Sequence, residues 1–458
     1  MDITEISSSI QNKEISIVDL VKEKLTVIQE KNSELNAFIT VAEEEALEAA
    51  EKLQEELENG QVRGPLHGIP ISIKDLIFTK GIRTTSGSKI YKDFIPEVDA
   101  TVVEKLKEAG AIIIGKANTH EFAYGPIGDR SYFGPCKNPH NSEKISGGSS
   151  SGSAASVAAD MVFASIGTDT GGSIRIPAAA CGVVGMKPTF GLVSKAGVFD
   201  LAYTLDHIGP ITKSVRDNAM ILNVIAGHDP KDEQSLKSEE KDYARLIGDS
   251  IAGKTVGIAS NDYFTDVVPE VKEAFDKVVA AFENLQASTK EVEVPAIEEI
   301  ADAQVDTIKS EASAVHAEGL ATNYRGNIDD EVYERLIDSQ ETKGYEYVQA
   351  QMKRSKFVKD LNEKFQEVDV IIAPTLPVLP TDIDQRVVEI NGEVVTVRYA
   401  LLKLTSPFNY TGNPVLSIPC GYSESGLPIG VQLIGRHGDE EVLYQFGAKL
   451  EAELAVRK

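Results

Sequence analysis

Cysteine is scarce in this chain, and the few cysteines lie far apart. They are Cys136, Cys181 and Cys420, and no CxxC pair occurs. An odd count without close pairs indicates neither a disulfide framework nor a structural zinc site. The seven histidines form no cluster with metal-ligand spacing, and the GxxxxGK[ST] phosphate loop is missing. We therefore expect neither a metal ion nor an organic cofactor.

Long apolar runs and an excess of positive charge are also missing. No uninterrupted apolar segment reaches the ~18–20 residues that a membrane-spanning helix needs. The opening residues, MDITEISSSIQNKEIS, are polar and unlike a leader peptide. The formal net charge is −25, and a strongly acidic chain repels phosphate backbones. We expect a soluble, cytoplasmic protein that binds neither nucleic acid directly nor membranes.

Apolar residues are abundant enough to build a large core. They make up 42% of the chain, which argues against global disorder. Helix-like patterns alternate with short β-branched runs, and each run is followed by a polar or glycine-rich loop. The predicted helices are 17–28, 42–58, 100–110 and several within 270–365; the predicted strands are 69–73, 111–115, 161–167, 255–260, 368–374 and 415–421. This alternation predicts an α/β fold around a buried sheet.

One charged, apolar-poor segment, residues 229–250, raises the question of a domain boundary. Strand patterns resume directly after it, so we interpret it as a surface excursion of one domain. We expect a single large domain, 1–458, with an N-terminal helical segment (1–60), a catalytic core (61–228) and a remainder (229–458) that carries the rest of the sheet and the helices of the substrate pocket.

The stretch SGGSSSGSAASVAAD, residues 146–160, resembles a flexible linker in composition. It runs directly into an apolar strand, however, and a second small-residue loop follows at 167–182, which indicates a site. Residues 148–152 also match the G-x-S-x-G nucleophile elbow, with Ser150 as nucleophile. That motif needs a strand before it, and residues 140–146 are polar and make a poor buried strand. None of the downstream histidines stands in an informative context.

Lys74 lies at the end of an apolar strand pattern, PISIKDLI. A lysine at such a place usually turns outward to solvent. With two serine loops in the same chain, a second interpretation arises, because a buried lysine has a lowered pKa and its neutral amine can act as a base. A serine hydroxyl becomes nucleophilic when such a base takes its proton. Asp75 should face away from Lys74, because adjacent strand residues point to opposite faces.

These segments resemble the amidase signature family of serine hydrolases. The run GGSSSGSAASVAADMVFASIGTDTGGSIRIPA, residues 147–178, is similar to the defining signature of that family, and GIPISIKD, residues 68–75, is similar to its lysine segment. The resemblance continues in IIIGKANTHEFAYG, CGVVGMKPTFGLVS, LDHIGPIT and FNYTGNPVLSIPCG. It implies a central mixed β-sheet covered by helices on both faces.

The resemblance also implies a Ser–Ser–Lys triad that hydrolyses linear amide bonds. Ser173 corresponds to the nucleophile, Ser149 to a bridging serine that follows a cis peptide bond, and Lys74 to the base. The backbone N–H groups of the oxyanion hole and the supporting side chains are also implied by the match. The oxyanion hole falls on Thr170, Gly171, Gly172 and Ser173, and the supporting residues are Ser150, Asp169 and Arg175.

The substrate is less well defined by the sequence. One branch of the family is the A subunit of glutamyl-tRNA amidotransferase. That branch binds the amino-acid end of glutamine partly with an aspartate just upstream of its equivalent of NYTGNP. Leu402 stands at that place here, and a leucine side chain cannot pair with an ammonium group. Phe122 and Tyr124 are candidates for an aromatic wall of the pocket, although core packing explains both equally well.

We therefore expect a stand-alone amidase that acts on small or aryl carboxamides, with esters as a side activity. The expected partner is a small-molecule amide, with a homodimer left open. Two alternatives remain at this point. The first is the glutamine-hydrolysing A subunit of a glutamyl-tRNA(Gln) amidotransferase. The second is a non-catalytic binding protein of the same fold, in which a residue of the triad should be missing.

Overall fold

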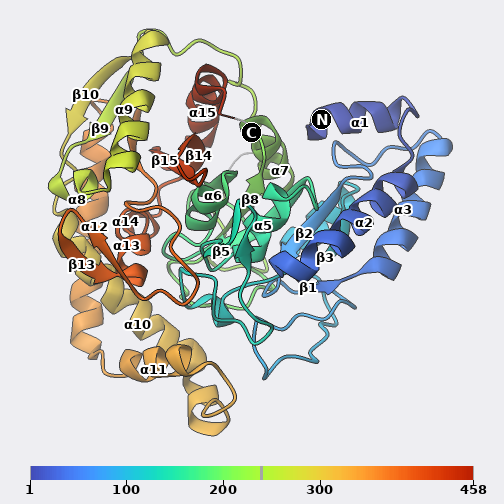
Figure 1. The fold of residues 1–458 in the computed structure, drawn as a ribbon, viewed down its shortest axis with the longest axis horizontal. Helices are drawn as coiled ribbons and strands as arrows, with labels where there is room; N and C mark the ends of the chain where they lie inside the picture. Colours follow the sequence, from blue (N-terminus) through green and yellow to red (C-terminus); the bar gives the residue numbers. More distant parts are fainter. Residues whose placement is uncertain (1, 238–240, 457–458) are drawn as a thin grey trace.

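An eleven-stranded mixed sheet runs through the molecule, and helices flank it (Figure 1). The computed structural model describes residues 2–237 and 241–456. No helix within these residues is long and apolar enough to cross a membrane. In spatial order the strands are β1 (Phe38–Val41), β3 (Ile112–Ala117), β2 (Pro70–Lys74), β6 (Ala164–Asp169), β8 (His207–Thr212), β7 (Val184–Lys187), β14 (Val415–Tyr422), β15 (Pro428–Ile434), β11 (Val370–Pro374), β9 (Thr255–Ala259) and β10 (Ser288–Val292).

Fifteen α-helices lie within the described residues, and the two that follow the serine-rich loops, α5 and α6, are short. The helices are α1 (Ile3–Gln11), α2 (Ile17–Leu35), α3 (Glu43–Glu58), α4 (Thr101–Glu108), α5 (Ser151–Ala158), α6 (Arg175–Cys181), α7 (Val215–Ile225), α8 (Asp262–Thr265), α9 (Pro269–Asn284), α10 (Ile297–Thr322), α11 (Asp330–Ser339), α12 (Gly344–Lys364), α13 (Val397–Lys403), α14 (Pro407–Thr411) and α15 (Glu440–Leu454). The helices α5 and α6 pack directly on the middle strands of the sheet.

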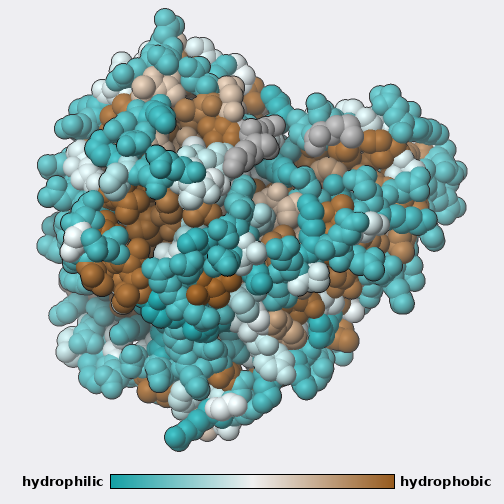
Figure 2. Space-filling model, in the orientation of Figure 1, coloured by the Kyte–Doolittle hydropathy of each residue, from teal (hydrophilic) through white to brown (hydrophobic). Residues whose placement is uncertain are grey.

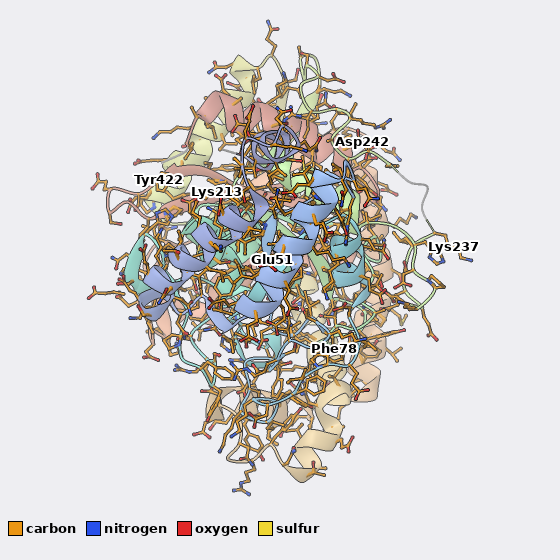
Figure 3. All side chains as sticks on the ribbon, turned by 90° about the vertical axis from the view of Figure 1, so that its right-hand side faces the viewer. Glu51, Phe78, Lys213, Lys237, Asp242 and Tyr422 are labelled. Atoms are coloured by element: carbon orange, nitrogen blue, oxygen red, sulfur yellow. The ribbon has the colours of Figure 1, made fainter. Side chains whose placement is uncertain are left out.

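The N-terminal helices form where the sequence predicts them. Helix α2 begins after Ser16, whose hydroxyl accepts a hydrogen bond from the backbone N–H of Asp19 at 3.2 Å, as an N-cap residue should. Helix α3 buries a stripe of apolar residues against β3, and its polar residues, Glu51 among them, face outward (Figure 3). The face shown in Figure 2 is largely hydrophilic, with hydrophobic residues gathered over the β13–α13 segment.

Two neighbouring strands position the candidate site. Strand β2 is buried along its whole length, and it pairs in parallel with β6, with Ile73 opposite Ile166. Because the strands are parallel, their C-terminal ends meet at one edge of the sheet. Lys74 ends β2, and Thr168 and Asp169 end β6 at the same edge. The chain then enters loops that carry most of the functional residues.

The structure contains strands that the sequence did not predict, among them β1, β7, β8 and β15 of the central sheet and the short strands β5 and β10. Residues 140–146 contain β5 (Asn141–Ile145), which pairs with β4 (Lys137–Asn138) in a separate hairpin and leaves its polar side chains partly exposed. The segment therefore forms a strand, but not one of the central sheet. Strand β10 (Ser288–Val292) was missed because it is a charged strand at the sheet edge and shows no buried run. A further hairpin joins β12 (Val387–Ile390) to β13 (Glu393–Thr396) just before α13.

Candidate active site

Lys74 is fully buried, and its ammonium group is directed at two hydroxyl groups. Its Nζ donates to Ser149 Oγ at 2.7 Å and to Thr168 Oγ1 at 2.7 Å. Both partners come from the two glycine- and serine-rich loops that the sequence singled out. The sequence analysis named Ser149 but not Thr168, which stands one residue before Asp169 in the GTDTGGS segment.

Burial lowers the pKa of Lys74 to about 7, although the carboxylates of Asp206 and Asp169 oppose this shift. Asp75 takes no part, because its carboxylate accepts from the backbone N–H of Thr85 at 2.9 Å on the other side of the strand. A substantial fraction of Lys74 is therefore neutral near pH 7, when the amine can accept a proton.

The loop before α5 holds Ser149 and ties the two serine loops together. The Gly148–Ser149 peptide bond is cis. Ser150 follows; its N–H donates to Ser173 O at 3.2 Å, and its hydroxyl donates to Thr168 O at 3.1 Å while accepting from Thr168 N. Ser150 thus links the loop before α5 to the end of β6 through two hydrogen bonds and to the loop after β6 through a third.

Ser173 and Ser150 differ in access to solvent. Ser173 lies on a cavity of about 170 Å³, and its hydroxyl makes no hydrogen bond to the other described residues. Ser150 is fully buried, does not line that cavity, and has its hydroxyl engaged by backbone groups. A substrate entering this cavity meets Ser173, so the geometry favours Ser173 over the nucleophile elbow at Ser150.

The loop from Thr170 to Ser173 presents backbone N–H groups next to Ser173. Among the described residues, the N–H groups of Thr170, Gly171 and Ser173 have no hydrogen-bond partner, whereas the Gly172 N–H donates to Asp169 Oδ1 at 2.8 Å. Of the four N–H groups that the resemblance implies for an oxyanion hole, the one of Gly172 is therefore engaged within the protein and the other three are free of protein partners. Gly172 also has a φ of +135°, and an added Cβ would lie 2.2 Å from Thr405 Oγ1, so that glycine is required there.

A buried ion pair fixes the shape of this loop. The Arg175 guanidinium donates to both carboxylate oxygens of Asp169 at 3.0 Å, and Asn409 Nδ2 donates to Asp169 Oδ1 at 2.7 Å. Burial alone would raise the pKa of Asp169, but the charge and hydrogen bonds of Arg175 and the bond from Asn409 keep it below its ordinary value. Arg175 also donates to Thr405 O at 2.9 Å, which joins the loop to the segment before α14. Asn409 stands in the FNYTGNP motif, to which the sequence analysis gave no role.

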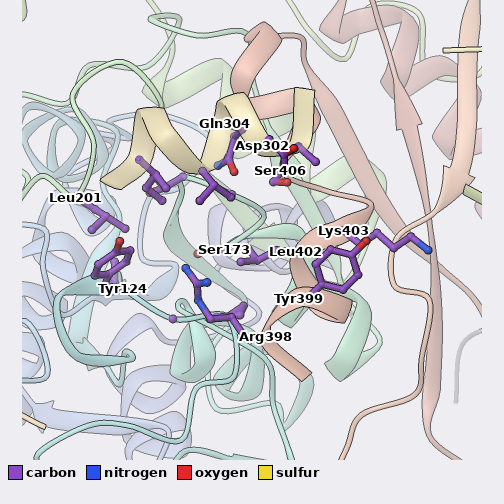
Figure 4. Close-up of a pocket in the computed structure, with 18 of the residues that line it drawn as sticks. Tyr124, Ser173, Leu201, Asp302, Gln304, Arg398, Tyr399, Leu402, Lys403 and Ser406 are labelled. Carbon is purple, nitrogen blue, oxygen red and sulfur yellow. The ribbon is translucent and has the colours of Figure 1, made fainter. Parts of the chain in front are cut away.

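The cavity in front of Ser173 is lined by residues from six segments of the chain (Figure 4). Tyr124 and Leu402, both predicted from sequence, line it. Phe122 does not: its side chain is fully buried and packs on Phe199, His316 and Tyr324, so the prediction of a pocket wall at Phe122 is wrong. Phe122 and Tyr124 lie two residues apart in a short turn, and only one of them faces the cavity.

Other lining residues were not found from the sequence. They include Asp302 and Gln304 on α10, and Arg398 on α13 beside Leu402. No motif marks them, because the helices that carry them follow ordinary amphipathic patterns. Within residues 2–237 and 241–456 no group of three or more His, Cys, Asp or Glu side chains is placed to hold a metal ion.

Comparisons with known proteins give a consistent result. The family profile named Amidase matches residues 19–444. The A subunit of glutamyl-tRNA(Gln) amidotransferase from Geobacillus thermodenitrificans is 40% identical over 472 residues, covering 98% of this chain and 96% of that protein.

Solved structures agree with these matches. A structure described as an unexpected vestigial protein complex that reveals the origins of an s-triazine catabolic enzyme superposes with a TM-score of 0.95 at 33% identity, covering 100% of this chain and 99% of that one. The A subunit of glutamyl-tRNA(Gln) amidotransferase from Thermotoga maritima superposes at 0.81 with 36% identity, covering 95% and 91%.

These matches correct the expectation about partners. The sequence analysis expected a small-molecule amide as the partner, no nucleic acid, and at most a second copy of the chain. The full-length relatives are named as one component of an amidotransferase whose name includes a glutamyl-tRNA. The expectation is therefore wrong. It rested on the acidic net charge of this chain, and that charge carries no information about other subunits.

Proposed function

Because this chain belongs to the amidase signature family, we propose that it hydrolyses a carboxamide by way of an acyl-enzyme on Ser173. The observation that carries the proposal is the 2.7 Å hydrogen bond from the buried Lys74 Nζ to Ser149 Oγ, made by a lysine whose pKa burial lowers to about 7. A neutral amine bonded to a serine hydroxyl is the arrangement that a proton relay requires.

The reaction runs in two halves. Neutral Lys74 accepts a proton from Ser149, and Ser149 accepts one from Ser173, whose oxygen bonds to the carbonyl carbon of the amide. The free N–H groups of the loop from Thr170 to Ser173 stabilise the oxyanion that forms. The C–N bond then breaks, and the proton returns through Ser149 to the leaving nitrogen. Water attacks the ester on Ser173 by the same relay and releases the carboxylic acid.

A non-catalytic binding protein of the same fold is disfavoured by the same contacts. Such a protein has no need for a buried lysine, because removing an amine from water costs several kcal/mol unless the group is partnered. Here Lys74, Ser149 and Ser173 are all present, and the free hydroxyl of Ser173 opens on the cavity.

The second candidate function is hydrolysis of glutamine by this chain as part of a glutamyl-tRNA(Gln) amidotransferase. The 40% identity to an A subunit of that enzyme over nearly the whole of both chains favours it, as does the 36% identity to the Thermotoga maritima protein. Leu402 opposes it, because this lining residue offers no charge for the ammonium group of glutamine. In either case we propose that the chain works as the amide-hydrolysing component of an assembly with other proteins.

Ammonia release from the purified chain tests the proposal. Propionamide, benzamide, the corresponding aryl ester and glutamine are supplied to the wild type and to Ser173→Ala, with and without the other subunits of a bacterial glutamyl-tRNA(Gln) amidotransferase. We expect amide hydrolysis by the wild type, none by Ser173→Ala, and labelling of Ser173 by a fluorophosphonate.

Three outcomes separate the candidates. Glutaminase activity that appears only with the other subunits selects the second candidate. Labelling at Ser150, with Ser173→Ala still active, rejects the acyl-enzyme on Ser173. An unlabelled, folded wild type that hydrolyses none of the amides leaves the binding protein as the better description.

A further inference from the structure

Arg398 carries a positive charge into the cavity without a negative partner. It lies on α13, and its guanidinium is placed between Tyr124 and Ser173 (Figure 4). Its Nε is buried and has no hydrogen-bond partner among the described residues, and the side chain forms no ion pair with them. The side chain as a whole is partly exposed, but a buried nitrogen of a cation without a partner costs free energy, and an anionic ligand that pairs with it removes this cost.

Three other charged side chains lie on or near the cavity. Asp302 lines it from α10, but its side chain is exposed and forms no ion pair with the described residues. Lys403 Nζ lies 2.9 Å from Asp266 Oδ2, and Figure 4 shows its side chain directed away from the cavity. The carboxylate of Glu331 acts electrostatically on Arg398, but it forms its ion pairs with Arg335 at 2.9 Å and with Arg386 at 3.0 Å. No carboxylate within the described residues therefore pairs with Arg398.

Burial lowers the pKa of Arg398 to about 10, and the positive charge of Arg335 adds to the effect. The guanidinium still carries its charge at neutral pH, since arginine does not deprotonate there. Its planar fork matches the two oxygens of a carboxylate, which it binds bidentately.

We propose that Arg398 binds a carboxylate of the substrate, so that the chain acts on carboxamides that carry an acidic group, such as the ω-monoamides of short dicarboxylic acids. This inference rests on the proposed function, because it assigns the substrate class of the same site.

The rest of the cavity defines the distance between the two ends of the substrate. Arg398 and Leu402 lie four residues apart on α13 and therefore share one face of the helix. Leu402 packs against the oxyanion loop, where its Cδ2 lies 3.1 Å from a Cβ placed on Gly171. An amide bound at Ser173 thus passes its carbon chain along Leu402 to reach Arg398. The cavity volume of about 170 Å³ suits a short chain.

The substrate class is tested with matched pairs of amides. Succinamate and glutaramate carry a terminal carboxylate, whereas butanamide and pentanamide have the same chain lengths without the charge. We expect the wild type to prefer the anionic member of each pair by roughly 100-fold in kcat/KM, as the loss of a desolvated charge pair implies. Arg398→Gln should remove this preference, mainly through KM, and Arg398→Lys should restore part of it.

Lys403→Gln is the matched control, because it removes a cation from a residue that lines the same cavity but pairs elsewhere. The ratio between anionic and neutral amides should be the same in Lys403→Gln as in the wild type. Equal turnover of both amides by the wild type, or an equal loss on both in Arg398→Gln, would overturn the proposal.

Ligand binding separates this inference from the proposed function. Glutarate is titrated by calorimetry into Ser173→Ala and into Ser173→Ala with Arg398→Gln, so that no turnover is needed. Binding by the first variant and its loss in the second support the carboxylate site even if the wild type hydrolyses no amide. Absence of binding to the first variant, with circular dichroism like that of the wild type, rejects the site while leaving the acyl-enzyme proposal intact.

Discussion

Replacing Lys74 by methionine should abolish amide hydrolysis and at the same time change how stability depends on pH. The side chain is fully buried, and its Nζ contacts Ser149 and Thr168. Methionine fills nearly the same volume with an apolar, unbranched chain and cannot accept a proton. The variant therefore separates the chemistry of the amine from the packing of its stem.

The expected magnitude follows from the pKa of about 7 for Lys74 in the folded protein. An unperturbed lysine titrates near ~10.4, so that at pH 7 roughly one molecule in 2,500 would be neutral instead of about half. In the wild type, kcat/KM should fall about tenfold for each pH unit below 6, because the base is then protonated.

Stability should change on the alkaline side of the same pKa. The folded pKa lies below the unfolded one, so the unfolded chain binds more protons between about pH 7 and ~10.4, and unfolding becomes less favourable as the pH rises through this window. Below pH 7 the folded protein holds a buried cation, which lowers the free energy of unfolding by about 4–5 kcal/mol. At pH 9 the lysine is neutral in the folded protein and charged in the unfolded chain, and the free energy of unfolding is lowered by about 2 kcal/mol. Between pH 6 and pH 9 the wild type should therefore gain about 2–3 kcal/mol relative to Lys74→Met.

Urea denaturation of both proteins at the two pH values measures this difference, and the subtraction removes the titration of all other groups. Activity is measured on an amide and on an aryl ester of the same acid. The ester should lose less, because its leaving group needs no proton.

A stability difference that does not change with pH would refute the lowered pKa. Equal losses on amide and ester would mean that Lys74 holds the site together without relaying protons. Unchanged activity would remove Lys74 from the mechanism altogether.

Three further predictions address other parts of the site. Ser173→Ala should abolish turnover with a melting temperature close to that of the wild type. Ser150→Ala should keep fluorophosphonate labelling of Ser173, and mass spectrometry of the labelled peptide shows which of the two serines is the nucleophile. Asp169→Asn should destabilise the protein by about 3–5 kcal/mol in urea, because it leaves Arg175 buried without a counter-charge, and a loss below about 1 kcal/mol would contradict this. Leu402→Asp should raise the turnover of glutamine relative to glutaramate by at least about tenfold, and an unchanged ratio would show that this position does not read the ammonium group.

Much of the fold follows from local patterns in the sequence. The strands that the sequence predicts are buried on both faces, and near-continuous apolar runs such as residues 69–73 and 111–115 are typical of such strands. Strand β10 escaped prediction because it lies at the sheet edge, where burial does not select apolar residues. Strand β5 was judged too polar for the central sheet, and the structure places it in a two-stranded hairpin outside that sheet.

The candidate site divides in the same way. Loops whose backbone must approach a ligand or another loop need glycine and serine. Ser149, Gly172 and Ser173 could therefore be predicted from the small-residue segments of the sequence. The places of Phe122 and Arg398 could not be predicted in this way, because whether a side chain of a helix or turn faces the core or a cavity depends on what packs opposite it. Phe122 faces three aromatic rings, and Arg398 faces the space in front of Ser173.

The separation of the three proposed catalytic residues along the chain has a structural reason. Lys74 ends β2 and Ser173 follows β6, and these strands are parallel neighbours, so their C-terminal ends share one edge of the sheet. Ser149 is brought to the same edge from the loop before α5, and Ser150 hydrogen-bonds this loop to Thr168 and Ser173. A lysine at the end of a buried strand cannot reach solvent without leaving the sheet, so its cation is desolvated by the fold itself. The lowered pKa of Lys74 is thus a consequence of where the strand ends, and the two loops supply the hydroxyl groups to which the neutral amine bonds.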